Sequence, residues 1–262
     1  MKRDQIDFPA RHAALREDVS LLGGLIGELL REQCGEALFL RVEDARSAAI
    51  DRRSGESTSE ALQALCRFTD TAEASDFIRG FAAWFRMVNL AEQVHRIRRR
   101  REYQKSATGP QPDSLLDVFS RLKQAGHDWA AIRSLLDDLL IEPVFTAHPT
   151  EATRRSILEK EQRMARYLVQ RMDPTLPPVE AERLVDRVRM EQTIAWLTAE
   201  QSHTRPTVAD EAEHAHFYLA NTLYRVAPLI HEAIADAAGQ VFGIDDWPGD
   251  MPTVLRFGSW VG

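Results

Sequence analysis

Long uninterrupted apolar runs are missing from this sequence of 262 residues. A membrane-spanning helix needs about 18 or more consecutive apolar residues, and no window approaches that length. The first residues, MKRDQIDFPARH, also lack the apolar segment of a secretory signal peptide. These absences argue against a membrane protein and a secreted protein, and we expect a cytoplasmic location.

Cysteine is scarce as well. The sequence has two, Cys34 and Cys66. Both lie in helix-like patterns, and neither belongs to the short paired spacing that metal sites and disulfide frameworks require. We therefore predict two buried free thiols and no metal site built on cysteine.

Lysine is rare, so arginine carries nearly all of the positive charge. The formal net charge is −7, which argues against nucleic acid as a partner. The most basic segment is HRIRRRR, residues 95–101. Because helix C-termini favour cations, we interpret this segment as a solvated helix end or as a partner for an acidic face. Abundant guanidinium groups suit phosphate or carboxylate ligands, but genomic base composition explains them equally well.

Most of the sequence has the apolar periodicity of α-helices. Apolar residues recur at spacings of three and four, which predicts amphipathic helices around a core supplied by 44% hydrophobic residues. The predicted helices cover residues 14–31, 69–103, 114–124, 129–139, 149–172 and 179–201, and a long helix begins near residue 207. An aromatic-rich stripe in the second helix is interpreted as core; it consists of Phe77, Phe81, Trp84, Phe85, Val88, Leu90 and Val94.

Helix-boundary residues refine these ranges. Asp113 is expected to cap the helix that begins at residue 114, and Thr207 with Asp210 resembles a capping box. Pro149 suits the first turn of a helix, where its missing N–H is not needed. Pro228 lies inside the last long helix and should kink it.

Two short segments depart from the helical pattern. Residues 142–147 (EPVFTA) are β-compatible and bounded by prolines. Residues 253–257 form a second candidate strand, and residues 258–262 are interpreted as the end of that strand passing into a glycine loop. The predicted fold class is therefore mainly α, a helical body with two short strands.

His148 stands where the first strand gives way to a helix. The first N–H groups of a helix are unpaired and favour anions, so a histidine there can offer a titratable nitrogen to a bound anion. Thr150 supplies a hydroxyl, and Arg154 or Arg155 supplies a guanidinium group for a phosphorylated or carboxylated molecule. The alternative is purely structural: a helix start in which both arginines pair with Glu151 and Glu159.

Two Glu-x-x-His pairs, Glu92/His95 and Glu211/His214, fall on long helices. Such pairs bind iron in di-iron four-helix bundles, but that site also needs two further inward-facing glutamates. In a chain rich in helix and glutamate two matches are unsurprising, so a di-iron bundle is a minor alternative. Four other histidines have no companion that raises them above ordinary surface or core residues: His12, His127, His203 and His231.

Several long motifs resemble one known family. VFTAHPTEATRR (residues 144–155) resembles the active-site histidine signature of phosphoenolpyruvate carboxylases, and RFGSWVG (256–262) resembles the opening of that family's second signature. The segments LREDVSLLGGLIGELLREQ, NLAEQVHRIRRRR and RPTVADEAEHAHFYLANTLYRVAP also resemble the family and occur in its order. The resemblance covers nearly the whole chain.

The resemblance implies a cytoplasmic carbon–carbon lyase that fixes carbon dioxide and replenishes the tricarboxylic acid cycle. Phosphoenolpyruvate and bicarbonate would give oxaloacetate and phosphate, with Mg²⁺ or Mn²⁺ as cofactor. His148 would be the catalytic residue, taking the proton of a carboxyphosphate intermediate. Trp260 would line the substrate pocket, and Arg155 is our second candidate for substrate binding.

The resemblance also implies a fold, an incomplete (β/α)8-type barrel that binds phosphoenolpyruvate, with active residues at the carboxyl ends of the strands. We expect an N-terminal helical region over residues 1–140 and the start of the barrel over 141–262. Family members are several times longer and are usually homotetramers. Because the second signature is cut at Gly262, the metal ligands are expected downstream, and the 262 residues alone are expected to be inactive.

An alternative hypothesis about the function is that the chain is a non-catalytic helical module that serves interaction or regulation. It would keep the helical scaffold and lack the activity. The two readings differ in whether an aspartate-rich glycine loop follows Gly262.

Overall fold

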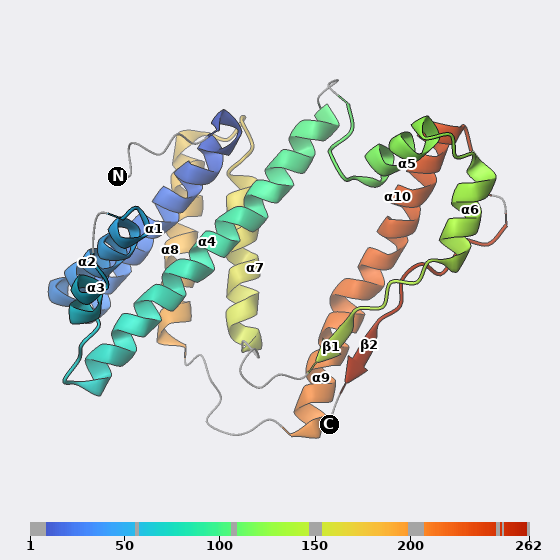
Figure 1. Cartoon of the computed structure of the whole chain (residues 1–262). Helices are drawn as coiled ribbons and strands as arrows, with labels where there is room; N and C mark the ends of the chain where they lie inside the picture. Colours follow the sequence, from blue (N-terminus) through green and yellow to red (C-terminus); the bar gives the residue numbers. More distant parts are fainter. Residues whose placement is uncertain are drawn as a thin grey trace. The chain divides into compact units, whose positions relative to one another are not determined.

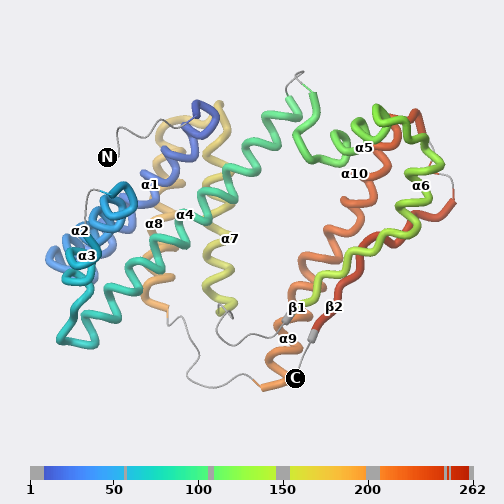
Figure 2. Tube along the Cα trace, in the orientation of Figure 1, coloured from blue at the N-terminus to red at the C-terminus, as the bar shows by residue number. Residues whose placement is uncertain are grey.

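The structure is a computed structural model that describes residues 9–55, 58–105, 109–146, 154–198, 207–244, 247 and 249–260. Figures 1 and 2 show the course of the chain. The contacts divide it into two compact units: unit 1 is Met1–Arg99 with Arg155–Glu200, and unit 2 is Arg100–Arg154 with Gln201–Gly262. Each unit is described by itself. The domain boundary near residue 140 stays a prediction.

Unit 1 is helical. After a 3-10 turn, η2 (Ala10–His12), come α1 (Ala13–Cys34), α2 (Glu36–Arg53), α3 (Ser59–Leu65), α4 (Thr71–Lys105, to Arg99 in this unit), α7 (Arg155–Gln170) and α8 (Pro178–Leu197). The helix ranges predicted at 14–31, 69–103 and 179–201 are thereby confirmed to within a few residues. Sequence periodicity found these helices because each turns one apolar stripe inward.

The core of unit 1 joins α1, α4, α7 and α8. Leu22, Val94 and Met164 are fully buried, and Leu30 is 2% exposed. Burying one such side chain stabilises a fold by about 1.5–3 kcal/mol. The predicted aromatic stripe is confirmed at Phe77, but Phe85 is 56% exposed. Phe85 instead packs edge-on against Trp84, which is partly buried against the core.

Charged side chains are buried where α1, α4 and the end of α7 meet. Asp18 is 5% exposed and accepts a hydrogen bond from Arg98 at 2.7 Å, with Arg171 at 3.8 Å. Arg98 also lies 3.2 Å from the buried ring of His95. The basic run thus finds an acidic partner, as predicted for a helix end. The ring of His12 lies 3.4 Å from that of His95, a contact that no sequence pattern indicated.

A second polar pair links α7 to α8. Arg163 donates two hydrogen bonds to Glu191, at 2.6 and 2.9 Å, and the hydrogen bond raises the pKa of Arg163. The Glu191 side chain is 5% exposed. Such a bidentate pair fixes the two helices in one register.

The thiols differ from the prediction. Cys34 at the end of α1 is half-buried, and Cys66, just after α3, is exposed. Burial raises the pKa of Cys34, and the negative charge of Asp76 adds to the effect. The prediction of two buried thiols is therefore wrong for Cys66, which lies at the C-cap of α3 rather than inside a helix.

Unit 2 combines helices with a small sheet. It contains α5 (Leu115–Gln124), α6 (Trp129–Asp138), β1 (Val144–Thr146), α9 (Val208–Tyr218), the π-helical turn η3 (Leu219–Leu223), α10 (Tyr224–Phe242) and β2 (Gly258–Trp260). Its core comprises Phe119, Ile132, Leu136, Ile234, Ala237, Ala238 and Val254. The fold is mainly helical, as predicted, and the structure does not show a barrel.

The two strands pair in parallel. Val144, Phe145 and Thr146 oppose Gly258, Ser259 and Trp260, respectively, and Ile141 forms an isolated parallel bridge with Leu255. Pro143 has no N–H to donate, so the ladder is interrupted between the bridge and β1. This interruption explains why the predicted strand at 253–257 holds only one bridged residue, Leu255, while β2 lies at Gly258–Trp260, in the segment predicted to be the end of that strand. A Cβ there would lie 3.3 Å from the Val144 side chain, so glycine permits the close approach.

Local chemistry explains the helix ends. The capping box of Thr207 and Asp210 is confirmed. Asp113 does not cap α5; Ser114 does, by accepting the N–H of Asp117 at 3.3 Å, while Asp113 takes a positive φ of 60°. Gly243 closes α10 in the left-handed conformation that glycine adopts without strain.

The long helix from Thr207 is irregular before Pro228, which lies inside α10. The turn η3 is π-helical and separates α9 from α10. A proline inside a helix removes one backbone donor and clashes with the preceding turn, which is why a kink was predicted at Pro228. The wider π-helical turn just upstream is a local irregularity that can relieve such a clash.

Candidate active site at the strand ends

The carboxyl ends of β1 and β2 meet at one end of unit 2. Thr146 and Trp260 are register partners in the last rung of the sheet. In Figure 1 the amino end of α9 lies at this same end, and α9 runs antiparallel to both strands. Parallel α/β folds keep their functional residues at this end of the strands.

The predicted site residues are described to different extents. His148 and Thr150 lie outside the described residues, which stop at Thr146 and resume at Arg154. For Trp260 the backbone at the end of β2 is described and the side chain is not. The roles of His148 and Trp260 therefore stay predictions.

The helix predicted to run unbroken from Pro149 is wrong at Arg154; Pro149 itself lies outside the described residues. Arg154 is not helical, and α7 begins at Arg155. The two arginines therefore do not follow His148 on an unbroken helix, as the anion-site argument assumed. Arg155 lies 3.3 Å from Glu159, which is the pairing of the structural alternative. Its role in substrate binding stays a prediction.

An aromatic cluster joins α9 to β1. The rings of Phe145 and Tyr218 stack at 6.1 Å and 9°, and His214 and Phe217 contact Tyr218 edge-on at 5.1 and 5.4 Å. No sequence pattern pointed to this cluster, because the strand and the helix are distant in the chain. It fixes one face of α9 against the strand that leads to His148.

One polar atom on α9 is orphaned. The Oε2 atom of Glu211 is buried and has no hydrogen-bond partner, although the residue is only half-buried overall. Buried carboxylate oxygens are normally paired, so each exception calls for an explanation. Glu211 belongs to one of the two Glu-x-x-His pairs that the sequence singled out.

The described residues offer no cluster of three or more His, Cys, Asp or Glu side chains that could hold a metal ion. In that part of the chain neither Glu-x-x-His pair finds the further carboxylates that a di-iron site requires. Nor does any described helix have the length and apolarity to cross a membrane.

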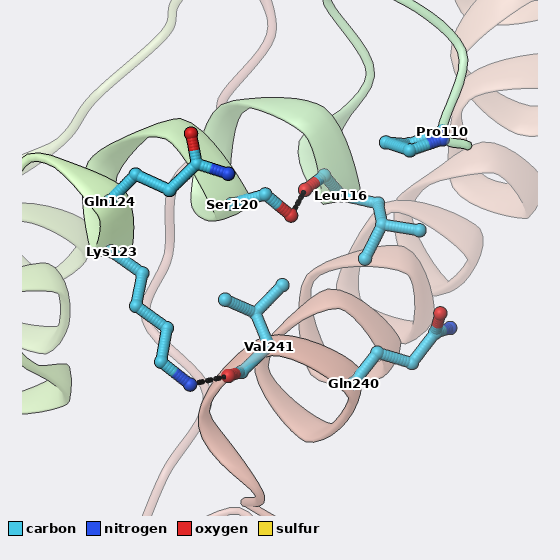
Figure 3. Close-up of a pocket in the computed structure, with 7 residues that line it drawn as sticks. All are labelled: Pro110, Leu116, Ser120, Lys123, Gln124, Gln240 and Val241. Carbon is cyan, nitrogen blue, oxygen red and sulfur yellow. Dashed lines mark hydrogen bonds between the residues drawn. The ribbon is translucent and has the colours of Figure 1, made fainter.

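A shallow open hollow lies elsewhere on unit 2, between α5 and α10 (Figure 3). Its volume is roughly 350 Å³. Lys123 reaches across it to donate a hydrogen bond to the carbonyl of Val241 near the end of α10. This contact satisfies a carbonyl of the last helical turn. None of the predicted site residues lines the hollow.

Comparison with known proteins gives a consistent family. The family model described as Phosphoenolpyruvate carboxylase matches residues 15–262. A phosphoenolpyruvate carboxylase of Xanthomonas oryzae pv. oryzae is 43% identical over 261 residues, which are 99% of this chain and 28% of that protein. One of Ralstonia nicotianae is 36% identical over 266 residues (100% and 27%), and one of Rhodothermus marinus is 35% identical over 252 residues (95% and 27%). The chain thus spans little more than a quarter of the length of these curated relatives.

Proposed function

Because the chain belongs to the phosphoenolpyruvate carboxylase family, we propose that it is the N-terminal portion of an enzyme that makes oxaloacetate and phosphate from phosphoenolpyruvate and bicarbonate. The observation that carries this proposal is the family match over residues 15–262. The parallel pairing of β1 with β2 supports it, since adjacent parallel strands are the repeating unit of the implied barrel.

In the proposed reaction, bicarbonate oxygen attacks the phosphoryl group of phosphoenolpyruvate. The phosphorus–oxygen bond to the enol breaks, giving carboxyphosphate and the enolate of pyruvate. Carboxyphosphate then loses its proton and splits into carbon dioxide and phosphate, and the enolate carbon attacks the carbon dioxide. These steps balance atoms and charge without an oxidant.

His148 is the proposed general base for the proton of carboxyphosphate. A base that works near neutral pH needs a pKa close to that pH, which imidazole has before any tuning. Trp260, at the end of the neighbouring strand, is proposed to line the pocket that holds the substrate. Arg155 is proposed to contribute a cationic group for the substrate's phosphate or carboxylate.

A divalent cation, Mg²⁺ or Mn²⁺, would stabilise the negative charge that develops on the enolate and phosphate oxygens. The described residues do not supply a ligand set for it. We propose that its ligands, and further groups that hold phosphoenolpyruvate, belong to the part of the family's length that this chain does not span. The chain alone should therefore form no oxaloacetate above the level of a His148→Ala control.

The whole enzyme is proposed to act in the cytoplasm as a homotetramer, without nucleic acid or membrane as a partner. In that setting it would fix carbon dioxide and replenish the tricarboxylic acid cycle.

A chimera tests the proposal. This chain replaces the matching segment of the Xanthomonas oryzae relative, and oxaloacetate formation is measured with phosphoenolpyruvate, bicarbonate and Mg²⁺. We expect activity that requires all three components. An inactive chimera would count against the proposed function and favour the non-catalytic helical module, and circular dichroism would show whether the chimera is folded.

A further inference from the structure

A chain of polar contacts runs from the surface turn η2 into the core of unit 1. The Nδ1 atom of His12 lies 3.4 Å from Nε2 of His95, and Nδ1 of His95 lies 3.2 Å from a guanidinium nitrogen of Arg98. Arg98 in turn donates a hydrogen bond of 2.7 Å to Asp18. His95 and Asp18 are 6% and 5% exposed, respectively. These contacts join η2 and α1 to α4.

The contact with Arg98 decides which nitrogen of the His95 ring carries a hydrogen. An arginine side chain offers only donors, so Nδ1 of His95 must be the acceptor and carries no hydrogen. In the neutral ring the hydrogen is therefore on Nε2, the atom nearest to His12. A second proton can bind only at Nδ1. It would remove the hydrogen bond from Arg98 and leave two cations facing each other 3.2 Å apart.

Most of the charged groups around this ring are cationic. In the described part of unit 1, the elements that meet at His95 carry these charged side chains: Arg11 on η2, Asp18 on α1, Glu92, Arg98 and Arg99 on α4, and Arg171 after α7. The buried carboxylate of Asp18 is already paired with Arg98 and Arg171. Glu92 is exposed, so water and salt screen its charge. His12 is a second titratable group, and its protonation would add to the positive charge. Burial and the surrounding cations therefore both oppose a charge on the His95 ring.

The same geometry argues against a metal ion shared by the two histidine rings. A neutral imidazole that binds a metal through Nε2 keeps its hydrogen on Nδ1. At His95 a donor of Arg98 already faces Nδ1. The pair of rings therefore suits a proton-dependent role better than metal binding.

We propose that His95 is a pH-sensitive latch in unit 1. With a neutral ring it holds Arg98, and through Arg98 the buried Asp18, so that η2 and the start of α1 stay attached to α4. Protonation of the ring releases Arg98 and loosens this attachment. The unfolded chain takes up the proton without that cost, so unit 1 loses stability as the pH falls through the range in which imidazole titrates, between about 5 and 8. This latch does not depend on the proposed function.

Thermal unfolding of the 262-residue chain at about pH 7.5 and about pH 5.5 tests the latch. Far-ultraviolet circular dichroism follows the transition. We expect the melting temperature of unit 1 to fall by roughly 3–10 °C on acidification, the effect of losing one hydrogen bond between a charged donor and a buried acceptor. His95→Asn places a carbonyl oxygen near the position of Nδ1, where it can accept from Arg98 without titrating. This variant should show at most about a third of the parent's shift, whatever its stability at the higher pH.

His127→Asn is the control, because His127 is exposed and belongs to unit 2. It should keep the full shift of the parent. Equal shifts in the parent and in His95→Asn would overturn the latch, since the acid sensitivity would then come from other groups.

A second measurement uses the parent alone and decides the case if His95→Asn does not fold. Amide hydrogen exchange is followed by mass spectrometry at the two pH values and corrected for the intrinsic pH dependence of exchange. Peptides from η2 and the first turns of α1 should lose protection at the lower pH, whereas peptides from α8 should keep it. Unchanged protection in η2 and α1 would also overturn the latch.

Discussion

Replacing Asp18 with Asn should destabilise unit 1 strongly. The Asp18 side chain is 7% exposed and lies 2.7 Å from Arg98, whose side chain is 19% exposed. Removing one partner from a buried pair costs about 3–5 kcal/mol, because the other charge stays buried without compensation. Asn retains one acceptor oxygen, so we expect a loss near the lower end, about 3 kcal/mol. The contact with Arg171, at 3.8 Å and 38% exposed, adds little because water screens it.

Thermal unfolding followed by far-ultraviolet circular dichroism measures the effect. At about 2–4 °C per kcal/mol for a chain of this size, the transition of unit 1 should fall by roughly 6–12 °C. Asp113→Asn is the matched control: Asp113 pairs with Arg121 at 3.1 Å, but its side chain is 88% exposed. Asn tolerates the positive φ at that position, and the loss should stay below about 1 kcal/mol. Equal shifts for the two variants would refute the argument from burial.

Two further predictions follow from the pKa directions. Burial and the charge of Asp76 raise the pKa of Cys34, so only a small fraction of this thiol is thiolate at pH 8. Iodoacetamide should therefore label Cys34 more slowly than the exposed Cys66, which peptide mass spectrometry can measure. Faster labelling of Cys34 would contradict this prediction. Hydrogen bonds from Thr207 lower the pKa of Asp210 below its usual 3.8. The contribution of this capping box to the free energy of unfolding is therefore present above about pH 4, and it is lost as the pH falls through the lowered pKa. A carboxyl NMR titration of Asp210 should show the lowered midpoint in the parent and a higher one in Thr207→Ala.

The helices were predictable where the pattern was local and periodic. The positions of α1, α4 and α8 follow from apolar spacing, and the cap of α9 follows from Thr207 and Asp210. Residues at the edge of an apolar stripe are harder to assign, and Phe85 shows this: its spacing fits a core position, but its side chain is 56% exposed.

Features set by distant residues were not predictable in detail. The limits of β2 depend on its pairing with β1 and on the missing N–H of Pro143. Both lie far from β2 in the sequence. The start of α7 at Arg155 is another such case, because no residue near Arg154 carries a local signal that would end or begin a helix there.

In the candidate site, too, local motifs were predictable from the sequence and contacts between distant residues were not. Sequence motifs pointed to His148 and Trp260, which the structure neither confirms nor contradicts. They gave no hint that Tyr218 stacks on Phe145 or that an oxygen of Glu211 is buried without a partner. Spacing singled out Glu211, but an i, i+3 pattern carries no information about which strand the helix faces.

The role of His148 is tested most directly by measuring oxaloacetate and phosphate together in the active chimera and its His148→Asn variant. General bases contribute about 100-fold or more to the step they serve. We predict that oxaloacetate formation falls by at least about 100-fold while bicarbonate-dependent phosphate release persists, because the phosphoryl step precedes the proton transfer. Undiminished oxaloacetate formation would contradict any catalytic role for His148, and equal loss of both products would move its role to the first step.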